Sequence, residues 1–221
     1  PRLNIQVLMT MDSPDRRFGA LVRRYLAPFA GEHDFHFHDL IQHPIARCHA
    51  CDVCPHGGKS GREASRSYRC RVRSRDDCVA RLHDDLVRAD AILIMGVSTP
   101  GEVIYRYQAF TERTRYLRRD NFQLTNIPIV GLLVEELGGA DLPLHNIKVL
   151  TSYIRHNTIL VSPLKITVMG SQVVHGPDFG PVLEQLVAIR AGRAASQGSA
   201  VAYQAEGYAH RGQDRLATVR K

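Results

Sequence analysis

Apolar runs alternate with amphipathic stretches along this chain, and together they predict the order of its strands and helices. The run Ala91–Gly96 is apolar throughout and shows no alternation of period two. Such a run is typical of a strand that is buried on both faces of a parallel sheet. The other predicted strands are Leu3–Thr10, Asp34–Ile41 (alternating, as in an edge strand), Asn126–Val134 and Thr158–Ser162, with Lys165–Met169 as a candidate for an extra strand.

Apolar positions three and four residues apart predict helices between these strands. They lie at Ala20–Ala30, Asp76–Asp90, Glu102–Leu117, Pro143–His156 and Gly180–Gly192. This alternation predicts an α/β fold, namely a three-layer, doubly wound parallel five-stranded sheet of order 2-1-3-4-5. We expect residues 1–193 to form this domain, with a cysteine-rich basic insertion at 44–78 and a polar C-terminal tail at 194–221.

Three polar loops are predicted to meet where ligands bind such a sheet, beyond the carboxyl ends of its strands. They are Met11–Gly19, Val97–Gly101 and Glu135–Gly139. The first joins a strand to a helix N-terminus, which is the geometry that binds phosphate, and Ser13 there can donate a hydroxyl group. Two simpler interpretations stay open: Ser13 only caps the helix, and Val97–Gly101 is an ordinary turn.

Composition narrows the class of partner. The chain has 221 residues, 44% of them hydrophobic, and a formal net charge of +7, which favours anionic partners. Many basic residues lie between Pro55 and Asp77 with Tyr68 as the single aromatic residue, so we expect a solvated basic loop and no nucleic-acid binding. No run of about 18 apolar residues and no secretory signal is visible, so we expect a cytoplasmic protein without a membrane span.

Five cysteines form the most specific chemical pattern. Cys48, Cys51 and Cys54 are spaced by two residues, and Cys70 and Cys78 follow. Close spacing in a cytoplasmic chain argues against structural disulfides and favours a [4Fe–4S] cluster. We predict Cys78 as the fourth ligand because it lies directly before the helical pattern Val79–Val87, so that a rigid element would hold it, with Cys70 as the alternative. Zinc and a set of unliganded thiols are the other interpretations.

Several motifs resemble those of the NADPH-dependent FMN reductase family of flavodoxin-like proteins, and of its iron–sulfur flavoprotein branch. The resemblance covers about Leu3 to Ala191. Asp12–Arg16 resembles the family's Gly-Ser-Pro-Arg phosphate loop, Cys48–Cys54 its cysteine motif, Val97–Gly101 its flavin loop, and Gln108–Arg113 its Lys-x-Phe-x-Asp-Arg helix. The chain departs from the family where Asp12 and Asp15 replace a glycine and an arginine, with Arg16 and Arg17 to offset them, and where Thr99 replaces an aromatic residue.

The resemblance implies an FMN-dependent oxidoreductase that passes electrons between NAD(P)H or another donor and a small-molecule or redox-protein acceptor. An electron carrier without its own substrate and a flavin-free, zinc-containing binding module are the alternatives. No side chain stands out as an acid–base catalyst. The metal ligands would be Cys48, Cys51, Cys54 and Cys78, and the cofactor contacts Ser13, Asp15, Arg16, Arg17, Phe18, Val97, Ser98, Thr99, Pro100, Gly101, Glu135, Glu136, Leu137, Gly138 and Gly139.

We also expect a homo-oligomer, either a dimer or a tetramer. The family resemblance is one reason. The other is the predicted helix Glu102–Leu117, which carries Tyr105, Tyr107 and Tyr116 beside its aliphatic face. Aromatic side chains are enriched in the cores of protein interfaces.

Overall fold

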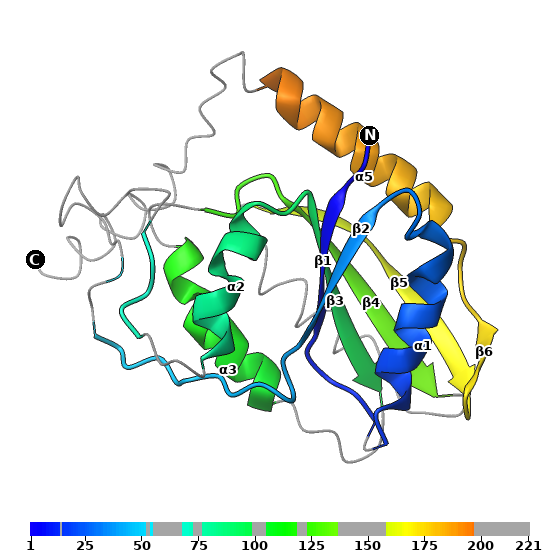
Figure 1. The fold of residues 1–221 in the computed structure, drawn as a ribbon, viewed down its shortest axis with the longest axis horizontal. Coiled ribbons are helices and arrows are strands. Elements are labelled where there is room, and N and C mark those ends of the chain that lie inside the picture. Colours follow the sequence, from blue (N-terminus) through cyan, green and yellow to red (C-terminus); the bar gives the residue numbers. More distant parts are fainter. Residues whose placement is uncertain are drawn as a thin grey trace, which may run out of the picture.

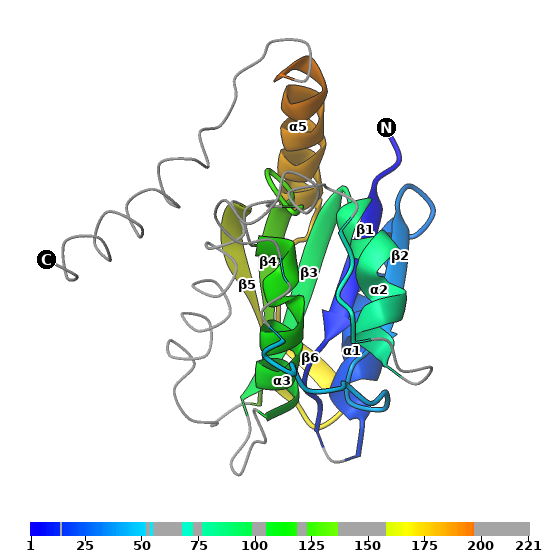
Figure 2. The same ribbon diagram turned by 90° about the vertical axis from the view of Figure 1, so that its left-hand side faces the viewer.

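A computed structural model of the chain describes residues 1–13, 15–51, 54, 68–72, 77–98, 105–118, 123–136 and 158–196. Within these residues the strands form one sheet, and helices cover both of its faces (Figure 1). The side view in Figure 2 shows α2 and α3 in front of the sheet and α1 behind it. This is the three-layer α/β arrangement that the alternation of strands and helices predicts.

In the part of the chain that the structure describes, the sheet contains six strands, so the prediction of five is wrong. Its order is β2-β1-β3-β4-β5-β6, and β6 pairs antiparallel with β5 while the other pairs are parallel. The extra strand forms because Gly170, with φ of 58°, lets the chain turn back directly after β5. The strands are β1 (Asn4–Met9), β2 (Asp34–Asp39), β3 (Ala91–Ser98), β4 (Pro128–Glu136), β5 (Ile159–Met169) and β6 (Gln172–His175).

The fifth strand is longer than predicted. Lys165–Met169, which we considered as an extra strand, is the second half of β5. Pro163 interrupts the pattern in the sequence but not the strand, because the pairing of β4 with β5 shifts register between Val130 and Leu132. Proline is tolerated in a sheet at such an irregularity, where its missing N–H group leaves no ladder bond unmade.

Two apolar clusters cover the two faces of the sheet. Helices α1 (Arg17–Leu26) and α5 (Gly180–Ser196) pack on one face, and α2 (Cys78–Val87) and α3 (Tyr105–Arg113) pack on the other. Strand β3 contributes alternate residues to both clusters, and Ala91, Ile92 and Leu93 are all 0% exposed. The prediction that this strand is buried on both faces is therefore confirmed.

Some predicted segments end differently or lie outside the described residues. Helix α1 is followed by a short 3-10 helix at Ala27–Phe29, and α3 by another at Thr114–Arg118. The predicted helix Pro143–His156 lies outside the described residues, as does the predicted tail from residue 197 onward. None of the described helices combines the length and the apolar character that crossing a membrane requires.

Substitution of Phe179 tests the packing on the face of the sheet that carries α1 and α5. It is 0% exposed, and its ring centroid lies 6.1 Å from that of Tyr25, 5.7 Å from Phe29 and 6.3 Å from Phe35. We expect Phe179→Ala to lower the free energy of unfolding by about 3–5 kcal/mol, because it leaves a cavity among these rings. Urea denaturation measures the change. The control Val174→Ala, at a side chain on β6 that is 46% exposed, should change it by less than about 1 kcal/mol.

Candidate functional site

The carboxyl ends of the parallel strands lie at one edge of the sheet (Figure 1), and the chain that carries Ser13, Asp15, Arg16 and Arg17 leaves β1 there. The chain leaves β1 at this edge, enters the loop Thr10–Arg16 and begins α1 at Arg17. The Thr10 hydroxyl group donates a hydrogen bond of 2.8 Å to the Met95 carbonyl oxygen in the neighbouring strand β3. This buried bond fixes the start of the loop between β1 and β3.

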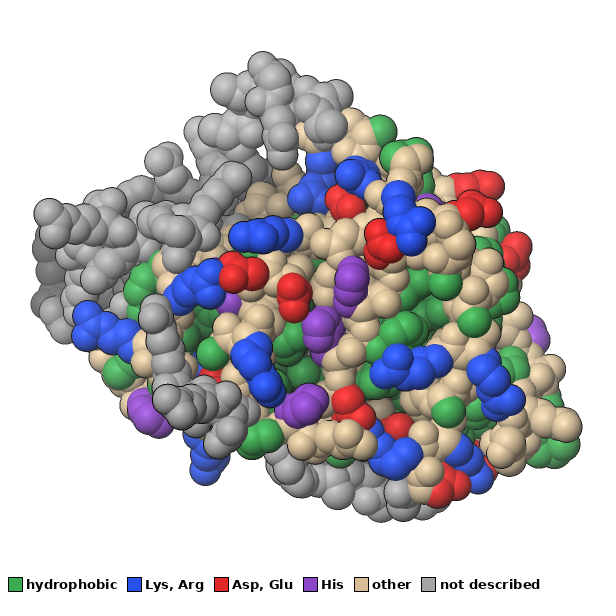
Figure 3. Space-filling model, viewed as in Figure 1, with side chains coloured by type: hydrophobic (Ala, Val, Ile, Leu, Met, Phe, Trp, Pro, Cys, Tyr) green, Lys and Arg blue, Asp and Glu red, His purple; other side chains and the backbone are tan. Residues whose placement is uncertain are grey.

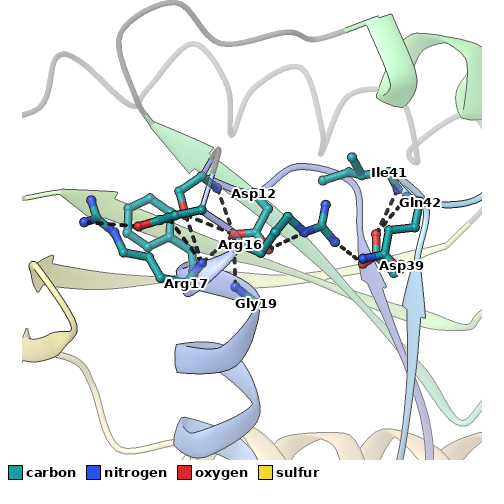
Figure 4. Close-up of polar contacts among 10 residues, drawn as sticks. Asp12, Arg16, Arg17, Gly19, Asp39, Ile41 and Gln42 are labelled. Carbon is teal, nitrogen blue, oxygen red and sulfur yellow. Dashed lines mark hydrogen bonds and ion pairs between the residues drawn. The ribbon is translucent and has the colours of Figure 1, made fainter.

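The carboxylate of Asp12 is the centre of this loop. Its Oδ1 atom accepts hydrogen bonds from the backbone N–H groups of Ser13 at 2.8 Å, Phe18 at 3.1 Å and Gly19 at 3.2 Å (Figure 4). The first N–H groups of a helix have no partner inside the helix and carry the positive end of its dipole. Asp12 supplies both the acceptor and the negative charge that this position favours.

Ser13 takes part in the same loop through its side chain. Its hydroxyl group donates to Asp15 Oδ1 at 2.7 Å and accepts from the Arg17 N–H group at 3.1 Å. The hydrogen bond from Ser13 lowers the pKa of the Asp15 carboxyl group. Ser13 is only 3% exposed. The simpler interpretation, in which Ser13 caps the helix, therefore describes its contact with the Arg17 N–H group but not its contact with Asp15.

The two arginines at the start of α1 point away from each other, and each contacts two carboxylates (Figure 4). Arg16, which has a left-handed φ of 63°, forms an ion pair with Asp39 at the end of β2, and its Nε lies 3.6 Å from Asp12. Arg17 forms an ion pair with Glu136 at the end of β4, and its Nη1 lies 3.8 Å from Asp15. The arginines thus hold three strand ends together.

The loop and the end of β4 are therefore brought together, as the sequence predicts for a ligand edge. Ser98 ends β3 and is paired in register with Glu135, whose carboxylate lies 3.1 Å from Lys165 Nζ. Phe18 contributes only its backbone, because its side chain is 0% exposed in the core. Val97 is likewise buried, at 1% exposure. Thr99, Pro100, Gly101, Leu137, Gly138 and Gly139 lie outside the described residues.

The predicted metal ligands differ in their surroundings. Cys51 is exposed and Cys48 and Cys54 are half-buried, whereas Cys78 is 3% exposed at the start of α2. Burial, and then the nearby Asp77 carboxylate, raise the pKa of the Cys78 thiol to about 11. Among the residues that the structure describes, no three His, Cys, Asp or Glu side chains are arranged to hold a metal ion. The four-cysteine ligand set stays a prediction.

A buried ion pair between Asp77 and Arg113 lies under α2 and α3. Both side chains are 0% exposed. Arg113 also donates to the Val72 carbonyl oxygen at 3.0 Å and to Cys70 Sγ at 2.8 Å, and Asp77 accepts from the Ala46 N–H group at 3.2 Å. The pair therefore joins both ends of the predicted insertion to α3. Our sequence analysis did not find it, although an arginine that closes the helix motif Gln108–Arg113 was a signal.

Tyr116 belongs to this buried region and not to a free surface. It is 2% exposed, its hydroxyl group lies 2.8 Å from His83 Nδ1, and the two rings stack with centroids 5.6 Å apart. The expectation that Tyr116 contributes to a subunit interface is therefore wrong. Its place on the aliphatic face of the predicted helix is explained by burial against α2.

Basic and acidic side chains are interspersed over the face of the molecule seen in Figure 3. At the carboxyl edge, the carboxylates of Asp12, Asp15, Asp39 and Glu136 surround the two guanidinium groups of Arg16 and Arg17. The positive net charge of the whole chain therefore does not describe this edge, where the paired groups carry more negative than positive charge.

Arg113→Met tests the buried ion pair. We expect the free energy of unfolding to fall by about 3–5 kcal/mol, because Asp77 keeps a buried charge with no cation beside it. Arg2→Met is the matched control, since Arg2 and Asp34 form an exposed pair with side chains 56% and 43% exposed. That change should stay within about 1 kcal/mol. Equal effects of the two substitutions in urea denaturation would contradict a special role for Arg113.

Cys78 and Cys51 should differ in reactivity. At pH 8 a thiol with a pKa of about 11 is almost entirely protonated, and only the thiolate reacts with iodoacetamide. We expect alkylation of Cys78 in the native protein to be at least about tenfold slower than that of Cys51, as followed by peptide mass spectrometry. The difference should vanish in urea, and similar rates in the native protein would show that Cys78 is accessible.

No family model and no curated protein matches the sequence. Among solved structures, the chain is similar to an NADPH-quinone reductase from P. pentosaceus (8% identity, TM-score 0.45, covering 84% of this chain and 94% of that one). It is also similar to general stress protein 14 from Treponema denticola in complex with FMN (6%, 0.46, 88% and 97%) and to an NAD(P)H:quinone oxidoreductase from Methanothermobacter marburgensis (10%, 0.44, 86% and 94%). Likeness at these values assigns no activity to this chain.

Proposed function

We propose that this chain is an FMN-dependent oxidoreductase that takes electrons from NAD(P)H and reduces a small molecule such as a quinone or a flavin. One observation carries the proposal. The backbone N–H groups of Ser13, Phe18 and Gly19 converge on a single anionic oxygen at the carboxyl edge of the sheet. Donors in this arrangement at a helix N-terminus are suited to a phosphate oxygen.

The position of this loop in the sheet supports the same proposal. The chain runs from β1 to β2 on one side, whereas β3 lies on the other side of β1. The order in which the chain adds strands to the sheet reverses at β1. Ligands of open α/β sheets bind in the crevice outside the carboxyl ends of the strands at such a reversal. The loop Thr10–Arg16 and the end of β3 flank that crevice.

Some of the described residues are of the kinds that bind a phosphate. The Ser13 hydroxyl group, the Phe18 N–H group and the Arg17 guanidinium group would hold it. Arg17 Nε is buried and has no hydrogen-bond partner among the described residues, so it has a donor to offer. Asp12 now occupies the place of one phosphate oxygen, and its carboxylate would have to move when FMN binds.

The rest of the site would hold the flavin ring. When bound, FMN accepts a hydride from NAD(P)H and passes the electrons to the acceptor. The segments Val97–Gly101 and Glu135–Gly139 are the proposed contacts to the ring. The ion pair of Arg17 with Glu136 would keep the phosphate loop and the end of β4 in a fixed relation. No acid or base from the described residues is required for hydride transfer to a flavin.

A [4Fe–4S] cluster held by Cys48, Cys51, Cys54 and Cys78 is a finer part of the sequence prediction, supported by the spacing of the first three cysteines. Among the described residues no three of these thiols, or other His, Asp or Glu side chains, are grouped to hold a metal ion. We therefore derive no electron-transfer step through a cluster. Assembly as a homo-oligomer and a place in the cytoplasm likewise rest on the sequence.

Titration with FMN, followed by NADPH oxidation with a quinone acceptor, tests the proposed function. We expect saturable binding that quenches flavin fluorescence, and NADPH oxidation that depends on added FMN. Ser13→Ala should weaken FMN binding by about 1.5–3 kcal/mol, since it removes a hydroxyl group that would bond a charged phosphate. Ser162→Ala, at an exposed position on β5, is the control and should bind FMN like the unchanged chain. Absence of flavin binding would refute the proposal.

A further inference from the structure

Asp12 is not expected in a phosphate-binding loop, because its carboxylate repels a phosphate. Its side chain is 4% exposed, so the carboxylate is packed into the loop and does not face solvent. While Oδ1 accepts the three converging N–H groups, Oδ2 lies 2.8 Å from the position that a Cβ atom would take on Gly19. Gly19 therefore gives Asp12 the space it occupies.

The charges around Asp12 do not prepare the loop for a second anion. Arg16 lies between Asp12 and Asp39, and Arg17 lies between Asp15 and Glu136 (Figure 4). Each guanidinium group is thus already shared by two carboxylates. Like charges within a few ångströms destabilise each other's charged forms. A phosphate that joined this group, with Asp12 still in place, would be repelled and would find its N–H donors already bonded.

We propose that Asp12 is a specificity-determining residue, a built-in anion that competes with the phosphate of FMN for the N–H groups at the start of α1. This inference rests on the proposed flavin function. FMN binds only as the Asp12 carboxylate leaves these donors, so the flavin is an exchangeable ligand. Riboflavin has the same ring but no phosphate, and it does not compete with Asp12. Asp12 therefore narrows the difference in affinity between FMN and riboflavin.

The ratio of the dissociation constants of riboflavin and FMN measures this competition. We expect Asp12→Ser to raise the ratio by about tenfold or more, because it frees donors that form charge-assisted hydrogen bonds with phosphate. Glu32→Gln is the control: it also removes one negative charge, but at an exposed position in the turn before β2, and it leaves Asp12 on the three N–H groups. Its ratio should change by less than about threefold, because only a screened, long-range charge effect remains. An unchanged ratio in Asp12→Ser, or equal ratios in both variants, would overturn the proposal.

Asp12 also caps α1, so Asp12→Ser could destabilise the fold. Asp12→Asn is a second variant that keeps the cap. Asparagine keeps an acceptor oxygen for the N–H groups and removes the charge. With circular dichroism confirming the fold, Asp12→Asn should raise the ratio by about threefold or more, since a neutral amide competes less well than a carboxylate. If Asp12→Ser does not fold, the ratio measured with Asp12→Asn tests the proposal in its place. An unchanged ratio in Asp12→Asn would then overturn the proposal.

Inorganic phosphate separates this inference from the flavin proposal. In NMR titrations, phosphate should shift the amide signals of Ser13, Phe18 and Gly19 at an about tenfold lower concentration in Asp12→Ser than in the unchanged chain. If this holds and neither flavin binds, the flavin function fails, but the competition of Asp12 with a phosphate anion for these N–H groups stands. Equal phosphate affinity in both proteins, or no binding to either, would overturn the role of Asp12 whatever flavin does.

Discussion

Burial of β3 on both faces is the constraint on which the rest of the structure depends. Its residues Ala91–Met95 are at most 1% exposed and contribute to two separate apolar clusters. Because both faces need cover, helices must pack on each side, and the parallel strands must be joined by crossovers. The loops that leave the carboxyl ends of the strands are then the places where polar side chains can gather without disturbing either cluster.

At that edge the decisive interaction is a carboxylate at the start of a helix. Unpaired N–H groups at a helix N-terminus need acceptors, and an anion from a ligand or from the chain itself can supply them. Here Asp12 supplies the acceptor, and Asp39 and Glu136 pair with the arginines that follow. The same geometry that suits the proposed flavin phosphate therefore also provides its proposed competitor.

The face of the sheet that carries α2 and α3 depends on a buried charge pair. Asp77 precedes α2 and Arg113 ends α3, and Arg113 also bonds Val72 and Cys70. A buried guanidinium group can satisfy several acceptors in one plane, so a single side chain holds three segments of the chain. Burial of either charge alone would be strongly destabilising, and the opposite charge offsets that cost. The local fold therefore requires this contact.

The sequence by itself determined the α/β class, the buried strands and the loop at the start of α1, because apolar runs and helical periodicity are local properties of a chain. The tertiary structure decided the sixth strand, the burial of Cys78 and Tyr116, and the partners of the arginines. Arg17 and Glu136 are 119 positions apart, and Asp77 and Arg113 are 36 apart. From the sequence alone, a cysteine or an aspartate that faces a ligand cannot be distinguished from one that faces the core. Only the packing of distant segments sets which polar groups meet and which are removed from water.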